Sequence, residues 1–151
     1  MIAHRSRIPE SPMRILPPAA ATLALALALA LPAAAQDYLS FRSPSGNIHC
    51  LIASWDGGYA RCDLDDYHPS FPRAPVWCEQ DYGFAFEVQA TGPGGVLCAG
   101  DTVIDPGAGV LDYGRSVVLG GVSCSSARDG MTCTNREGHG FTVARAAQRV
   151  F

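Results

Sequence analysis

His139 is the residue of this sequence best suited to acid–base chemistry near neutral pH. It lies between two glycines in the sequence GHGF at residues 138–141. Together with a carboxylate such as Asp101 or Asp129, it would provide the general base of a small cell-wall-directed hydrolase. The sequence contains neither a G-x-S-x-G nor an H-E-x-x-H motif, however. A hydrolase or an enzyme inhibitor using His139 is therefore the alternative interpretation, and a non-catalytic binding domain is favoured.

Aromatic and histidine side chains on predicted loops indicate where such a domain would bind. Trp55 lies in SWDGG, where an aromatic ring at a turn could stack on a sugar or on a protein surface. Tyr67 and His68 follow in segment 65–74, which contains two prolines. With His139, these are the predicted binding residues, and we expect the partner to be a protein or a glycan of the cell envelope.

An acidic sequence, DLDDYH at residues 63–68, is the part of the chain that most resembles a cation site. Three carboxylates close together could bind calcium, but their spacing lacks the pattern of an EF-hand loop. We therefore predict a solvated acidic loop, with neither a bound metal ion nor a cofactor.

Six cysteines predict the covalent framework of the protein. Their number is even, and no two of them have the C-x2–4-C spacing of a zinc site. They follow a sequence typical of exported proteins, and disulfides form in oxidising compartments. We therefore predict three disulfides among Cys50, Cys62, Cys78, Cys98, Cys124 and Cys133.

Turn signals suggest how these cysteines pair. Asp-Gly lies between Cys50 and Cys62 and again between Cys124 and Cys133, as in two hairpins. A loop at 127–130 places Cys124 opposite Cys133, within disulfide reach. Cys50 and Cys62 come nearly opposite each other within a one-residue bulge. The pairing of Cys78 with Cys98 follows by elimination.

The N-terminal region predicts export. Residues 19–35 are apolar and uncharged, follow three arginines and end in three alanines, the pattern that signal peptidase cleaves. A membrane anchor needs about 20 apolar residues, and this run is slightly shorter. We predict a signal peptide over residues 1–35, with Met13 as an alternative start. The mature protein would be secreted or periplasmic, without stable membrane insertion.

The remaining region, 36–151, is acidic. It has 13 acidic and 8 basic residues, a net charge of −5, and every basic residue is arginine. Because it has no basic stripe, nucleic acid is excluded as a partner.

Hydrophobic alternation in this region predicts an all-β fold. Short alternating runs, such as 38–42, 59–64 and 83–89, are separated by glycine and proline. This pattern indicates one domain, a small disulfide-stapled antiparallel sandwich or barrel. We also expect a short strand at 76–79 and, as an option, a short helix at 65–70 or 146–150.

Two residues beside cysteines are assigned to opposite environments. His49 points away from the face that carries Cys50, and we predict that it is exposed. Trp77, next to Cys78, is predicted to pack against the core.

Three stretches taken together resemble a known family. They are FRSPSGNIHC at 41–50, VLCAGDT at 96–102 with LDYG at 111–114, and MTCTNREGHGFTVAR at 131–145. The combination is similar to an uncharacterised family of small secreted, cysteine-containing bacterial proteins, a domain of unknown function. The resemblance implies export and paired cysteines. It implies no activity, and it assigns no catalytic or binding residue.

Overall fold

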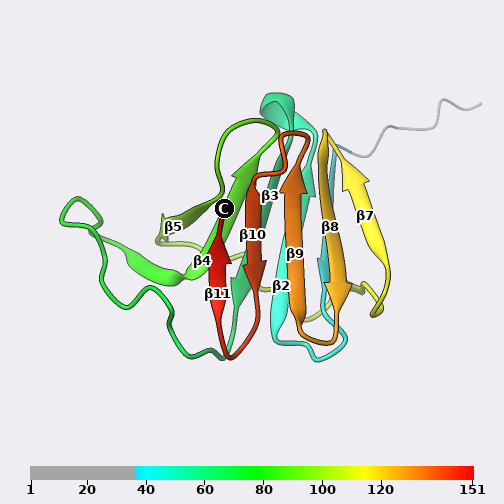
Figure 1. Cartoon of the computed structure of the whole chain (residues 1–151). Coiled ribbons are helices and arrows are strands. Elements are labelled where there is room, and N and C mark those ends of the chain that lie inside the picture. Colours follow the sequence, from blue (N-terminus) through cyan, green and yellow to red (C-terminus); the bar gives the residue numbers. More distant parts are fainter. Residues whose placement is uncertain (1–36) are drawn as a thin grey trace, which may run out of the picture. The chain divides into compact units, whose positions relative to one another are not determined.

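The computed structural model describes residues 37–151, which form a sandwich of two β-sheets (Figure 1). The predicted all-β class is confirmed, because strands and turns make up the whole of this region apart from one 3-10 turn. Gln36–Phe151 is one compact unit. The predicted signal peptide lies outside the described residues.

The first sheet has six strands. Neighbouring strands are antiparallel throughout, except that the short β6 pairs with β1 in parallel. The 3-10 turn η3 (Trp55–Gly57) joins β2 to β3. Across the sheet the order is β5 (Gly95–Ala99), β4 (Asp81–Gln89), β3 (Tyr59–Leu64), β2 (Ile48–Ala53), β1 (Tyr38–Arg42) and β6 (Gly109–Val110).

The second sheet is an antiparallel meander of five consecutive strands. In Figure 1 its strands lie in front of the strands of the first sheet. The order is β11 (Gln148–Val150), β10 (Gly140–Val143), β9 (Gly130–Asn135), β8 (Val122–Ala127) and β7 (Ser116–Leu119).

The core lies between the two sheets and contains two of the disulfides. On each strand, alternate residues face inward, as the period of two requires. Phe86 and Phe141, one from each sheet, are both fully buried and their ring centroids are 6.2 Å apart. Cys62 Sγ of the first sheet lies 3.7 Å from Cys133 Sγ of the second. The two hairpin disulfides therefore meet at the centre of the sandwich.

All three predicted disulfide pairs are confirmed: Cys50–Cys62, Cys78–Cys98 and Cys124–Cys133. Cys124 is directly opposite Cys133, as predicted. Cys50 is directly opposite Cys62 in an uninterrupted ladder, so the predicted bulge is absent there. The five residues 54–58 form the turn of that hairpin and need no extra residue in either strand.

A connecting segment, which we call the strap (residues 100–108), crosses the outer face of the first sheet. It leaves β5 at one edge and rejoins the sheet at β6 on the other. Asp101 contacts Arg61 of β3, Asp105 contacts His49 of β2, and Ala108 contacts Arg42 of β1. The strap is thus bonded to three successive strands.

The strap explains why the prediction of an exposed His49 was wrong. His49 does point away from the core, but the strap covers it and only 4% of its surface is exposed. Its Nε2 lies 2.9 Å from the Gly46 carbonyl oxygen, and its Nδ1 lies 3.1 Å from the carbonyl oxygen and 3.3 Å from the amide nitrogen of Asp105. A second layer of chain thus buries the outer face of this strand.

Three other predictions are corrected. Residues 75–78 form a turn closed by a 2.9 Å bond from the Cys78 amide to the Pro75 carbonyl, and no strand forms at 76–79. Trp77 on this turn is 68% exposed and does not pack in the core. Neither proposed helix forms: 65–70 is loop, and strand β11 occupies 148–150, where it pairs with β10.

Candidate functional site

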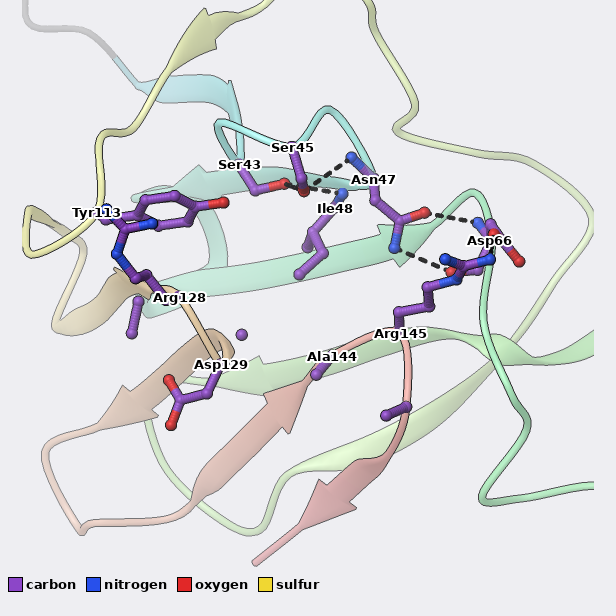
Figure 2. Close-up of a pocket in the computed structure, with 13 residues that line it drawn as sticks. Ser43, Ser45, Asn47, Ile48, Asp66, Tyr113, Arg128, Asp129, Ala144 and Arg145 are labelled. Atoms are coloured by element: carbon purple, nitrogen blue, oxygen red, sulfur yellow. Dashed lines mark hydrogen bonds and ion pairs between the residues drawn. The ribbon is translucent and has the colours of Figure 1, made fainter.

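A cleft of about 620 Å³ opens at one end of the sandwich and is the candidate site (Figure 2). Three turns meet there: the turn between β1 and β2, the turn between β8 and β9, and the turn between β10 and β11. In Figure 1 the last two lie at the lower end of the molecule. The polar or charged lining residues are Ser43, Ser45, Asn47, Asp66, Tyr113, Arg128, Asp129 and Arg145.

One wall of the cleft is a hydrogen-bonded link between two loops. The side-chain nitrogen Nδ2 of Asn47 donates to the Asp66 backbone carbonyl over 2.9 Å, and the side-chain oxygen Oδ1 of Asn47 accepts from the Asp66 backbone N–H over 2.8 Å. The Asp66 carboxylate in turn pairs with Arg145 at 2.6 Å. These bonds hold the wall in place, and they occupy the polar groups of the residues that form it.

The opposite wall carries an arginine on an aromatic ring. Arg128, in the two-residue turn after β8, lies over the ring of Tyr113 with its Cζ 5.2 Å from the ring centroid. This is a cation–π distance. Both residues are exposed, and Figure 2 shows them side by side at the edge of the cleft. Their polar groups are therefore available to a ligand.

The floor of the cleft is apolar. Ile48, which is 5% exposed, lies at the base, and Ala144 lines the side below it. Ser43 is also buried here, but its hydroxyl bonds to the Ser45 hydroxyl and accepts from the Ile48 amide. An apolar base beneath a polar rim is the usual composition of a small-molecule site.

The charges around the cleft balance. Arg128 and Arg145 are matched by Asp66 and Asp129. The site therefore shows no net preference for an anion or a cation.

A second charged cluster lies beneath the strap. Arg61 donates to both carboxylate oxygens of Asp63, at 2.8 and 2.9 Å, and also to the exposed Asp101. Burial alone would lower the pKa of Arg61, but its hydrogen bonds to Asp63 and Asp101 outweigh burial and raise that pKa. The hydrogen bond from Arg61 also lowers the pKa of Asp101. Every group in this cluster has a partner, so its role is structural.

The predicted binding residues are divided between the two ends of the molecule. Ile48, at the start of β2, lines the cleft, whereas Trp55 follows the other end of that strand. His139 likewise follows the far end of β9, whose first residue, Gly130, lines the cleft.

The other two predicted residues lie near the cleft without lining it. Tyr67 is partly buried and packs against the core. His68 donates its backbone N–H to the Arg145 carbonyl over 2.8 Å, beside the wall described above. Tyr67 and His68 therefore lie near the cleft, whereas Trp55 and His139 lie at the other end of the molecule.

The geometry does not assemble the catalytic pair that the hydrolase interpretation needs. His139 is exposed, and within residues 37–151 it forms hydrogen bonds through its backbone alone. Asp101 is bonded to Arg61, while Asp129 lies at the cleft end of β9, opposite to His139. Neither proposed carboxylate is thus placed to act with His139.

Sequence reasoning missed the residues that do line the cleft, among them Ser45, Arg128 and Arg145. A signal was present, because Ser45 belongs to the SPSGNI stretch and Arg128 to a correctly placed hairpin turn. What the sequence did not show is that these turns come from different sheets and converge at one end.

Two kinds of functional feature are absent from residues 37–151. No group of three or more His, Cys, Asp and Glu side chains in this region is arranged to hold a metal ion. Over the same residues, no helix is both long and apolar enough to cross a membrane.

Fold and site together define a disulfide-bonded β-sandwich with a cleft at one end. Residues 21–151 match the Family of unknown function (DUF6636), and the chain belongs to that family. Comparisons with curated proteins and with solved structures gave no match.

Proposed function

We propose that this protein is an exported, non-catalytic binding domain and that the cleft is its ligand site. The observation that carries the proposal is the composition of the cleft, an apolar floor beneath a rim whose charges cancel. A neutral ligand with an apolar face and several hydroxyl groups complements such a surface. A sugar ring of a cell-envelope glycan has this chemistry, and we expect a ligand of this class.

Export is supported by the disulfides and by the leader-like sequence. Three bridges without a free cysteine in the described region are typical of proteins from oxidising compartments. The apolar run at 19–35, ending in small residues, is typical of a cleaved signal. The proposed location is the periplasm or the exterior of the cell.

The test is an NMR titration of residues 36–151 with neutral oligosaccharides released from bacterial envelopes. We expect saturable shifts of the backbone signals of Ser45, Tyr113 and Arg128, which lie on different sides of the cleft. Arg128→Ala should weaken binding about three- to tenfold, because it removes a hydrogen-bond donor from the rim.

Arg149→Ala is the matched control. Arg149 makes the same kind of contact, with its Cζ 4.7 Å from the ring centroid of Phe151, but it does not line the cleft. This variant should bind like the parent protein. Saturable shifts confined to another surface, or equal losses in both variants, would rule out the cleft as the ligand site.

A further inference from the structure

An aromatic pair lies at the end of the molecule opposite to the cleft. Tyr38, at the start of β1, and Trp55, in the turn η3, have ring centroids 5.6 Å apart and planes tilted by 42°. The two residues are 52% and 44% exposed. The pair therefore keeps about half of its surface in contact with solvent instead of burying it in the core.

The backbone beneath this pair is fixed in position. Ser54 donates its backbone N–H to the Asp37 carbonyl over 2.8 Å, which joins the two segments that carry the rings. Gly58 is packed so closely against the turn between β7 and β8 that a Cβ there would meet the Gly120 carbonyl oxygen at 1.6 Å. The backbone segments that carry the rings are thus held by the fold before any ligand arrives, which lowers the entropic cost of binding.

The turn also contains the only non-glycine residue with a positive φ in residues 37–151. Asp56 has φ 52° and ψ 28°, in the left-handed region. Such conformations are uncommon outside glycine and cluster at ligand sites. Here the residue in this conformation is acidic and directly follows the exposed Trp55.

The charged residues adjacent to the two rings in the sequence are both negative. Asp37 precedes Tyr38 and Asp56 follows Trp55, and the segments 37–41 and 54–60 contain no basic residue. Nucleic-acid bases also stack on aromatic rings, but their phosphates need basic groups. An organic cation is attracted both by the ring faces and by the carboxylates.

We infer that Tyr38 and Trp55 form a second ligand site, which takes a quaternary ammonium group such as that of choline. A trimethylammonium group has an apolar surface and a permanent positive charge, so it suits an aromatic, acidic site. The site is separate from the cleft and does not depend on the function proposed for it.

The experiment is a fluorescence titration with choline chloride at constant ionic strength. It uses residues 36–151 carrying Trp77→Phe, so that Trp55 is the only tryptophan. We expect a saturable change in Trp55 emission with a midpoint on the order of 1 mM, because two exposed rings provide a weak cation site. The neutral carbon isostere of choline, 3,3-dimethyl-1-butanol, should bind at least about tenfold more weakly.

Two variants test the residues of the site. Tyr38→Leu keeps an apolar side chain but removes the ring, and we expect it to weaken choline binding about threefold or more. Asp56→Asn removes the charge and tolerates the left-handed backbone, with an expected loss of about two- to fivefold. Two-dimensional NMR spectra confirm that both variants are folded.

Tyr82→Leu is the matched control, because Tyr82 is a partly exposed tyrosine that does not line the cleft and lies at the end of β4 opposite to Gln89, the partner of Tyr59 beside η3. It should leave choline binding unchanged. The inference is overturned if the emission change does not saturate, if the neutral isostere binds as well as choline, or if Tyr38→Leu binds as well as the parent.

Discussion

The Asp63 carboxylate accepts a hydrogen bond from the Thr102 hydroxyl at 2.9 Å, although the two residues are 39 positions apart in the sequence. The same carboxylate oxygen accepts the backbone N–H of Val103, also at 2.9 Å. Asp63 thus joins β3 to the strap while it neutralises the buried Arg61. One buried carboxylate fixes the course of the chain between the two edges of the sheet.

Asp63→Asn should therefore be strongly destabilising. The substitution keeps the shape of the side chain but leaves the charge of Arg61 without its buried partner, which costs about 3–5 kcal/mol. Urea denaturation measures the free energy of unfolding. Asp66→Asn is the control, since the Asp66–Arg145 pair is exposed on both sides and is worth at most about 1 kcal/mol. Equal losses in the two variants would contradict a special role for Asp63.

Acid should loosen the attachment of the strap through Asp101. The hydrogen bond from Arg61 lowers the pKa of Asp101 in the folded protein below its unfolded value of 3.8. The stabilisation is therefore present above that pH and is lost as the pH falls through the lower, folded pKa. Because Asp101 is exposed, the effect is at most about 1 kcal/mol.

Asp101→Asn tests this prediction. It should lower the free energy of unfolding at about pH 7, and the difference from the parent should shrink as the pH approaches about 2. Asp112→Asn, a change at another exposed aspartate, should show no such convergence. A constant difference at all pH values would show that the ion pair with Arg61 does not cause the effect.

Gly58→Ala should be more damaging than Gly57→Ala. Both glycines have positive φ, so both substitutions strain the backbone by about 1 kcal/mol. A Cβ at position 58 would in addition collide with the Gly120 carbonyl, whereas nothing lies within 4 Å of a Cβ at position 57. We expect a further loss of about 1–3 kcal/mol for Gly58→Ala in denaturant unfolding. Similar free energies of unfolding for the two variants would show that the η3 turn and the turn between β7 and β8 can move apart without cost.

The disulfides should open in a defined order under mild reduction. Cys78 is partly exposed on its turn, whereas the four cysteine residues of the hairpin disulfides are at most 1% exposed. A thiol must reach a sulfur atom in order to attack it. Dithiothreitol should therefore open Cys78–Cys98 first, as detected by alkylation and peptide mass spectrometry. In denaturant all three should open together, and an early opening of Cys124–Cys133 in the native protein would contradict the prediction.

Local patterns were sufficient to predict much of the fold. Strands Tyr38–Arg42 and Tyr59–Leu64 occur at the predicted residues, and the run at 83–89 lies within β4, because alternation and turn residues are local signals. The pairing of Cys124 with Cys133 follows from the same information, since a short turn fixes the register of a hairpin.

Features that depend on distant contacts were not predicted. His49 is buried by a strap that begins more than 50 residues later, and no local pattern contains that information. A short helix was one option for segment 146–150, but residues 148–150 form an edge strand beside β10. The cleft has the same cause, because its walls come from turns that are far apart in the chain.

The disulfide connectivity has a consequence for biogenesis. Counted from the N-terminus, the first cysteine is bonded to the second, the third to the fourth and the fifth to the sixth, with separations of 12, 20 and 9 residues. A polypeptide that is oxidised progressively as it emerges, starting from its N-terminus, acquires the native bridges simply by joining each thiol to its successor. Maturation of this chain therefore needs an oxidase and makes little demand on a disulfide isomerase.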